Sequence, residues 1–143
     1  MAEYFTQASR IRRMTQSKTS DLTVLGAPVT GPLEHVESFP APAGCVKVKF
    51  STDEVNSLCP VTGQPDISSV QIEYLPRSRC VESKSLKLYL WSFREKQIFA
   101  EGLAVQIAEE IRNAVSPAWV RVVVTQHPRG GIVIETTSEF DDR

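Results

Sequence analysis

The sequence lacks the features that mark membrane-spanning, secreted and nucleic-acid-coating proteins. No apolar run approaches the roughly 20 residues that a transmembrane helix needs, and residues 1–18 contain no apolar core of the signal-peptide type. Sixteen Lys and Arg residues nearly balance 17 Asp and Glu residues, so no strong basic field is present to attract nucleic acid. We therefore expect a cytoplasmic protein that neither enters a membrane nor binds nucleic acid directly.

Cysteine and histidine are also scarce. The three cysteines are not spaced as CxxC pairs, and neither of the two histidines has a cysteine or a second histidine nearby. A disulfide framework and a zinc ligand set are therefore not expected, and we predict no metal site. No GxGxxG follows a predicted strand, which argues against a Rossmann dinucleotide site.

A change in composition near residue 43 divides the chain. The total of 143 residues suits one domain of about 100–150 residues. Basic residues gather between residues 10 and 18, and several prolines and glycines follow between residues 26 and 42. We predict an N-terminal arm at residues 1–43, which could fold onto a neighbouring subunit, and a single domain at residues 44–143. A nucleic-acid-binding tail is a second reading of the arm, but its basic residues are few.

Hydrophobic periodicity predicts two strands, two helices and two further strands. The segments 45–50 and 69–76 alternate as half-buried strands do. The segments 82–93 and 98–115 carry apolar residues at helical spacing, and Pro117 follows the second. The segments 118–126 and 131–137 are rich in β-branched residues. This order predicts an α+β unit whose open sheet edges favour a homo-oligomer with sheets continued between subunits.

The loop NSLCPVTGQPD at residues 56–66 places a thiol and a carboxylic acid in one short, turn-rich stretch. An ionised cysteine is a strong nucleophile, and a carboxylic acid donates protons if its site raises its pKa. Cys59 is therefore a candidate nucleophile and Asp66 a candidate proton donor. The pattern alone leaves open that Cys59 is inert and buried, which is the more common role of a free cysteine.

Two other places could bind phosphate groups. Arg129 and Gly130 lie in the segment HPRGG, and Lys84 and Lys87 lie near the start of the first predicted helix. A hairpin turn and an exposed helix face are the more common roles of such residues. The residue pattern alone leaves both readings open.

Three blocks taken together resemble one family. LCPVTGQPD, VESKSLKLYLWSFR and HPRGG, spread over about residues 45–135, are similar to the single-module 7-cyano-7-deazaguanine reductases of the QueF family. These are NADPH-dependent nitrile reductases of queuosine biosynthesis. The resemblance implies the tunnelling fold (T-fold), in which units of two strands, two helices and two strands assemble into a ring with active sites between subunits. It also implies pentameric rings that stack into decamers.

The resemblance implies a role for each site residue. Cys59 would attack the nitrile carbon of 7-cyano-7-deazaguanine and form a covalent thioimide. Asp66 would protonate the nitrogen while two NADPH molecules deliver hydrides, and the product would be 7-aminomethyl-7-deazaguanine. Residues that would contact the substrate are Val81, Glu82, Ser83, Ala100 and Glu101. Residues that would contact NADPH are Ser83, Lys84, Lys87, Arg129 and Gly130.

Ala100 departs from the family pattern, which commonly has a histidine directly before the substrate-binding glutamate, here Glu101. Alanine can neither transfer a proton nor cover the base with a ring. The alternatives to the reductase are a plain scaffold protein, in which Cys59 and Asp66 are structural, and two relatives of the family. One is an amidine-forming relative that adds ammonia to the nitrile of a modified transfer RNA, and the intact ESKSLKLY segment argues against it. The other is a non-catalytic relative that keeps the deazapurine pocket, and Ala100 is its support.

Overall fold

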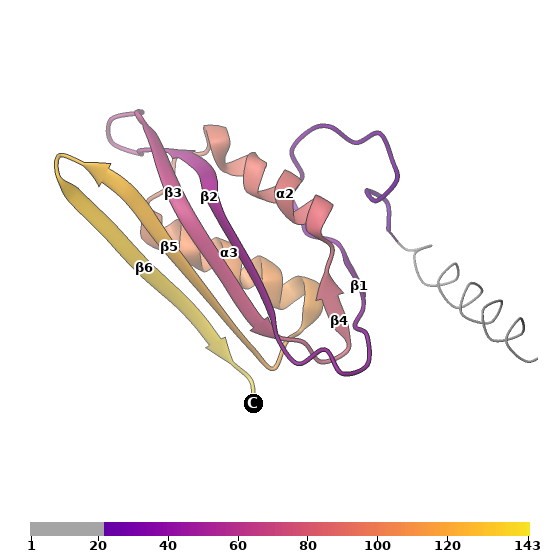
Figure 1. Cartoon of the computed structure of the whole chain (residues 1–143). Coiled ribbons are helices and arrows are strands. Elements are labelled where there is room, and N and C mark those ends of the chain that lie inside the picture. Colours follow the sequence, from indigo (N-terminus) through magenta and orange to yellow (C-terminus); the bar gives the residue numbers. More distant parts are fainter. Residues whose placement is uncertain (1–21) are drawn as a thin grey trace, which may run out of the picture.

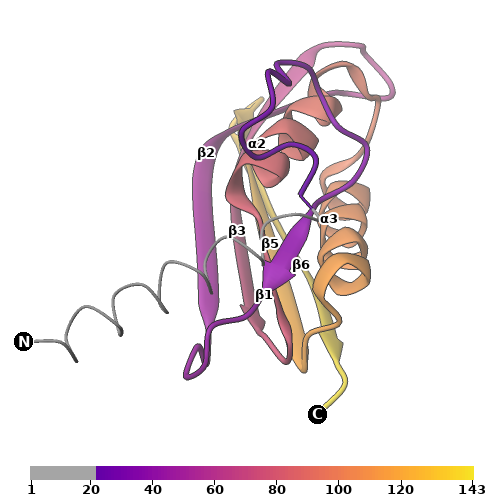
Figure 2. The same ribbon diagram turned by 90° about the vertical axis from the view of Figure 1, so that its right-hand side faces the viewer.

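The structure, a computed structural model, describes residues 22–143. Its strands are β1 (Ser38–Pro40), β2 (Val48–Leu58), β3 (Pro65–Leu75), β4 (Arg79–Val81), β5 (Trp119–Arg129) and β6 (Ile132–Asp141). Its helices are α2 (Ser83–Trp91), the 3₁₀ helix η1 (Ser92–Glu95) and α3 (Ala100–Val115). Both α-helices cover one face of the main sheet and leave the other face open (Figures 1 and 2). The predicted order of two strands, two helices and two strands is confirmed for the main body.

The main sheet has the order β2-β3-β5-β6, with each neighbouring pair antiparallel. The β2–β3 and β5–β6 hairpins turn at the same end of the sheet, because the start of β3 pairs with the end of β5 at Ser68 and Gln126. Strands β2 and β6 are the two edges. A separate ribbon of β1 and β4 lies at the other end of the molecule (Figure 1).

Strand β2 differs from its prediction, which placed a strand at residues 45–50. The strand begins at Val48 and continues to Leu58 through the polar stretch STDEVNSL. A register shift between Thr52 and Val55 marks an irregularity in its pairing with β3. Polar side chains are tolerated there because β2 is an edge strand with much of its length exposed. The β1–β4 ribbon was also not predicted, because each strand has only three residues.

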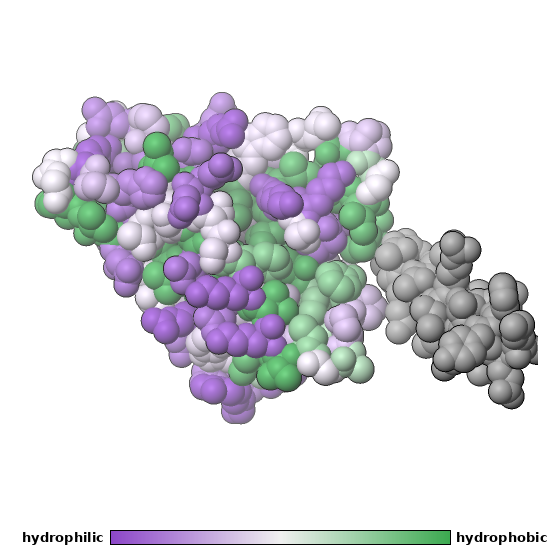
Figure 3. All heavy atoms as spheres, in the orientation of Figure 1, coloured by the Kyte–Doolittle hydropathy of each residue, from purple (hydrophilic) through white to green (hydrophobic). Residues whose placement is uncertain are grey.

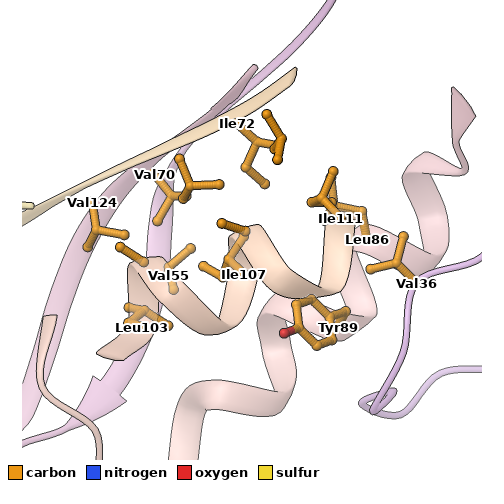
Figure 4. Packing of buried hydrophobic residues seen from close by; sticks show 14 of the residues in the cluster. Val36, Val55, Val70, Ile72, Leu86, Tyr89, Leu103, Ile107, Ile111 and Val124 are labelled. Carbon is orange, nitrogen blue, oxygen red and sulfur yellow. The ribbon is translucent and has the colours of Figure 1, made fainter. Parts of the chain in front are cut away.

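The core lies between the helices and the covered face of the sheet. Ile107 and Ile111 of α3 are fully buried, and Val70, Ile72 and Val124 are 1%, 1% and 0% exposed. Figure 4 shows these side chains meeting between helix and sheet. Apolar residues recur at helical spacing along α3 and at every second position along the strands. The apolar side chains of the helix and of the sheet therefore face each other. The periodicity that predicted these elements therefore also predicted their buried faces.

The open face of the sheet is polar. Ion pairs join Lys47 to Glu73 and Arg121 to Glu139 across neighbouring strands. Figure 3 shows a largely hydrophilic surface here. The edge strand β6 differs, because the three consecutive residues 132–134 are apolar and 68%, 56% and 37% exposed. Such an apolar edge strand can pair with another chain.

The described part of the predicted arm packs on the domain. Val36 belongs to the core, and its backbone N–H donates to the Glu110 carboxylate at 2.6 Å. The Lys84 ammonium donates to the carbonyl oxygens of Val24 and Ala27 at 2.9 and 2.7 Å. The basic stretch at residues 10–18 lies outside the described residues. The boundary at residue 43 stays a prediction.

Within residues 22–143, no helix has both the length and the apolar character to cross a membrane.

Replacing Ile107 by alanine should lower the free energy of unfolding by about 2–5 kcal/mol, because it leaves a cavity between α3 and the sheet. Val105→Ala is the matched control on the same helix, since this side chain is 43% exposed. Chemical denaturation at a fixed protein concentration would measure both. Equal losses for the two variants would contradict the assignment of α3's buried face.

Candidate active site

Cys59 lies in the turn of the β2–β3 hairpin, directly after β2 ends. Its backbone N–H donates to the Gln64 carbonyl at 2.8 Å, and its own carbonyl accepts from Gly63 at 2.9 Å. Gly63 has φ of +68°, a conformation in which a side chain would be strained. The Cys59 side chain is 6% exposed. The turn therefore fixes the position of the thiol.

The end of β2 is bound to the segment that leads into α3. Leu58 donates its N–H to the Lys96 carbonyl at 2.9 Å and accepts from the N–H of Ile98 at 3.1 Å. A shallow hollow lies here, with Pro60 on one side and residues at the start of α3 on the other. Its lining is Pro60, Gln97, Ile98, Phe99, Glu101 and Gly102. The predicted substrate residue Glu101 thus borders a hollow beside the Cys59 loop.

Arg129 joins the two hairpins. It precedes the turn Gly130–Gly131, where both residues have positive φ (62° and 78°), as the tight turn of a β-hairpin requires. Its Nη2 lies 3.3 Å from Oδ1 of Asp66. Its Nη1 lies 3.3 Å from the hydroxyl oxygen of Thr62 and 3.2 Å from the side-chain oxygen of Gln64. The guanidinium therefore holds the Cys59 loop from the second hairpin.

Polar side chains replace the apolar core at this end of the covered face. Asp66 is 7% exposed and pairs across the hairpin with Ser57, which is 3% exposed. Ser68 and Gln126 follow on the neighbouring positions and are 2% and 9% exposed. Within the described residues, every buried side-chain nitrogen or oxygen that is fully shielded has a hydrogen-bond partner. The covered face of the sheet is therefore polar near the hairpin turns.

The surroundings of Cys59 favour its ionised form. The hydroxyl of Thr62, the backbone N–H of Thr62 and the Arg129 guanidinium together lower the pKa of the Cys59 thiol from 9.0 to about 6. The same contact with Cys59, and the charge of Asp66, raise the pKa of Arg129. Because a thiolate is the reactive form of cysteine, the loop presents a nucleophile that is ionised at neutral pH.

Ala100 and Glu101 form the first turn of α3. Ala100 is 6% exposed, and Glu101 is exposed at the hollow. Both therefore lie close to the Cys59 loop, together with Phe99, whose side chain is 57% exposed. The structure brings Cys59, Asp66, Ala100, Glu101, Arg129 and Gly130 to one end of the sheet.

The predicted residues of the ESKSLKLY segment lie elsewhere. Helix α2 begins beside β4, at the opposite end of the sheet from the β2–β3 turn (Figure 1). The Glu82 carboxylate caps this helix, accepting from the N–H groups of Lys84 at 2.8 Å and Ser85 at 2.7 Å. Val81 is 3% exposed, and its N–H donates to the Tyr74 hydroxyl at 2.9 Å. Glu82 and Val81 therefore have structural contacts within this chain.

A groove of about 460 Å³ lies between β2 and α2 and includes Ser83 and Lys87. Leu90 and Trp91 contribute apolar walls, and Lys87 and Arg94 contribute positive charge. Apolar walls beside cations suit a flat ring that carries phosphate groups, so these residues fit NADPH. Lys84 does not line this groove; its ammonium holds the N-terminal segment instead.

Two polar residues of the Cys59 loop were not predicted as site residues. Thr62 and Gln64 lie between Cys59 and Asp66 in sequence, and both accept hydrogen bonds from Arg129. The only sequence signal was their place in that loop. Their contacts depend on the second hairpin, which is distant in the chain. Within residues 22–143, no group of His, Cys, Asp and Glu residues could hold a metal ion.

Comparison with known proteins agrees with the resemblance read from the sequence. Residues 65–143 match the family model described as QueF-like protein. The NADPH-dependent 7-cyano-7-deazaguanine reductase of Desulfovibrio desulfuricans is 41% identical over 133 residues, which is 87% of this chain and 80% of that relative. The reductase of the same name from Granulibacter bethesdensis is 42% identical over 121 residues, covering 80% and 78% of the two chains.

A solved structure is also similar. The archaeosine synthase QueF-Like in its apo form superimposes with a TM-score of 0.64 at 29% identity, covering 72% of this chain and 97% of that one. The identities to the reductases and the extent of the family match are sufficient to assign the family. The chain belongs to the QueF family, which includes the NADPH-dependent 7-cyano-7-deazaguanine reductases.

Proposed function

We propose that this chain is an NADPH-dependent nitrile reductase that converts 7-cyano-7-deazaguanine into 7-aminomethyl-7-deazaguanine in queuosine biosynthesis. The observation that carries the proposal is the Cys59 loop, where a thiol of lowered pKa, a buried carboxyl group and an arginine lie together. The reductases that are 41% and 42% identical to this chain support the choice of substrate and of NADPH.

The first step joins the substrate to Cys59. The thiolate attacks the nitrile carbon, a C–S bond forms and one π bond between carbon and nitrogen breaks. The nitrogen takes a proton from Asp66, so the product is a neutral thioimide. Asp66 lies in the same hairpin as Cys59 and is 7% exposed, which places a proton donor beside the nucleophile.

NADPH, when bound, supplies a hydride for each of the two reduction steps. After the first reduction the Cys59 sulfur leaves as a thiolate and an imine remains. The contacts that lower the pKa of Cys59 make the sulfur a better leaving group in this step. Asp66 is placed to exchange protons with the nitrogen in both steps. The overall reaction consumes one nitrile, two NADPH and two protons, and yields one amine and two NADP⁺.

Glu101 is suited to bind the guanine-like edge of the substrate. Its carboxylate is exposed at the hollow beside the Cys59 loop and can accept two N–H donors at once. The exposed ring of Phe99 borders the same hollow. Ala100, directly before Glu101, is 6% exposed and belongs to the hydrophobic core. These residues and Cys59 would hold the ring and the nitrile at one place.

A complete site is proposed to combine two copies of the chain. The Cys59 loop and the start of α2 lie at opposite ends of the sheet (Figure 1), yet both carry residues of the proposed site. Strands β2 and β6 are free edges, and residues 132–134 of β6 are apolar and exposed. Pairing of these edges would build the T-fold ring, for which we propose pentamers that stack as decamers.

Amidine formation is the second candidate, because the solved structure described above is of an archaeosine synthase. That reaction would use Cys59 and Asp66 in the same covalent step but would require ammonia in place of hydride. The cationic, apolar groove at Ser83 and Lys87 favours the reductase, since ammonia needs no such site. The non-catalytic alternative is disfavoured by the lowered pKa of Cys59, which a binding module would not require.

The reductase is tested by following the near-ultraviolet absorbance of NADPH with 7-cyano-7-deazaguanine as substrate. We expect two NADPH to be consumed per nitrile, and none with Cys59→Ala, because no thioimide can form. Cys45→Ala is the matched control, since Cys45 lies outside the hairpin turn, and should retain activity. Absence of NADPH consumption in the wild type, with a covalent adduct seen by intact mass, would exclude the reductase. Ammonia would then be tested as the second substrate, to distinguish the amidine reaction from the non-catalytic relative.

Asp66→Asn should separate covalent capture from reduction. The amide cannot give up a proton as an acid does, so we expect reduction to slow by about 10²–10⁴-fold while an adduct with the nitrile still forms. Rapid quenching followed by intact-mass measurement would detect the adduct. Reduction at the wild-type rate in this variant would remove Asp66 from the mechanism.

Ala100→His should raise the rate of NADPH consumption by roughly tenfold or more if the site is impaired by the missing imidazole. Ala100→Gln is the control, since its side chain is also large and polar but transfers no proton. Steady-state rates at saturating substrate would compare the three proteins. A lower rate in Ala100→His would mean that the pocket has adapted to the small residue.

A further inference from the structure

Three large side chains follow one face of α2 into η1. Lys87, Trp91 and Arg94 are spaced four and three residues apart, and all three line the groove between β2 and α2. The backbone stays helical where α2 passes into η1, because Trp91 (φ −62°, ψ −30°) and Ser92 (φ −58°, ψ −22°) both have right-handed helical angles. Residues at this spacing are neighbours on a helix surface. One wall of the groove therefore carries an aromatic ring and two cations.

Arg94 is held against the ring of Trp91. Its guanidinium carbon lies 5.3 Å from the centroid of the ring, which is within the range of a cation–π contact. A guanidinium over an aromatic ring still has N–H groups at its edge that can donate to an anion. Within residues 22–143, neither Arg94 nor Lys87 forms an ion pair with a carboxylate. The ring therefore orients Arg94 without using its hydrogen-bond donors.

The groove carries a net positive charge. Its charged lining residues are Lys87 and Arg94 on the helical side and Glu54 on β2. Two cations against one carboxylate favour a ligand with negative charge. Phe50 and Leu90 contribute apolar surface, and the volume of about 460 Å³ is typical of a small-molecule site. The groove therefore suits a flat ring that carries a phosphate group.

One phosphate of this kind distinguishes NADPH from NADH, and it is attached to the 2′-oxygen of the adenosine ribose. Arginine suits such a group, because its planar fork can form two parallel hydrogen bonds to phosphate oxygens. The Lys84 ammonium is already bound by the carbonyl oxygens of Val24 and Ala27 at 2.9 and 2.7 Å. Arg94 and Lys87 line the groove itself. They are therefore the cations best placed for this phosphate on the helical side of the groove.

We propose that Arg94, supported by Lys87, binds the 2′-phosphate of NADPH and selects this cofactor over NADH, and that Trp91 is a positioning residue for Arg94. This inference deepens the proposed function and rests on it for the identity of the cofactor. The adenine ring would lie along the apolar surface of Phe50 and Leu90. None of these residues acts on the nitrile, so they set cofactor affinity and leave the chemical steps to Cys59 and Asp66.

Calorimetric titration with NADP⁺ and with NAD⁺ tests this site without nitrile and without turnover. The two dinucleotides differ only in the 2′-phosphate, so the ratio of their Kd values reports its recognition. We expect the wild type to bind NADP⁺ more tightly. Arg94→Gln should reduce the ratio by about 10- to 100-fold, because it removes hydrogen bonds to a charged group. Arg94→Lys keeps the charge but not the fork, and should retain part of the preference.

Arg121→Gln is the matched control, since it makes the same change of charge at an exposed position on the open face of the sheet. Its ratio should equal that of the wild type. A wild type without a preference for NADP⁺, or without binding of either dinucleotide, would overturn the proposal. An unchanged ratio in Arg94→Gln would also overturn it, as would equal losses in Arg94→Gln and Arg121→Gln.

The role of Trp91 is tested by its own variants. Trp91→Leu removes the ring that orients Arg94 and should lower the ratio, whereas Trp91→Phe keeps an aromatic face and should retain most of it. In the Arg94→Gln background, Trp91→Leu should lower the ratio little further, because the side chain that it positions is gone. Fully additive losses would refute the positioning role of Trp91.

The NADPH assay with 7-cyano-7-deazaguanine separates this inference from the proposed function. If both hold, Arg94→Gln should raise KM for NADPH and retain kcat. A preference for NADP⁺ that depends on Arg94, without NADPH consumption in the wild type, would refute the reductase and leave the phosphate site standing. NADPH consumption with an unchanged KM in Arg94→Gln would leave the reductase standing and refute the phosphate site.

Discussion

The antiparallel pairing of β3 with β5 is the contact on which the site depends. The two strands belong to different hairpins and are separated in sequence by both α-helices. Their register sets Ser68 against Gln126, so the turns of the two hairpins lie at the same end of the sheet. Arg129 can reach Asp66 and Thr62 only because of this alignment. A slip of one residue would turn the side chains of one strand to the opposite face.

The covered face of the sheet is apolar over most of its length and polar near the hairpin turns. The candidate residues Cys59 and Asp66 lie at the polar end. Toward the β4 end the strands carry valine, isoleucine and tyrosine against α2 and α3. Toward the hairpin turns the same face carries Ser57, Asp66, Ser68 and Gln126. The apolar part stabilises the sheet by removing hydrocarbon from water. The polar part is built on that rigid base, which keeps the acid and the thiol in fixed positions.

The helices, the order of the elements and the Cys59–Asp66 loop could be predicted because their signals are local. A helical stripe such as that of α3 repeats over sixteen residues, and the loop motif spans a single turn. The second half of β2 and the β1–β4 ribbon could not, since a polar edge strand and three-residue strands have little periodicity. The partnership of Thr62 with Arg129 depends on sheet register, which the residue pattern does not contain.

The attachment of the N-terminal segment has a thermodynamic consequence. The Lys84 ammonium is already bound by the carbonyl oxygens of Val24 and Ala27, and the Glu37 carboxylate accepts from the N–H groups of Thr23 and Val24. An anion that bound this ammonium would have to displace the segment. The attached segment would therefore weaken the binding of the anion by the same factor by which the anion weakens the attachment of the segment. Binding of any anion to Lys84 is therefore coupled to detachment of residues 23–27 from the start of α2.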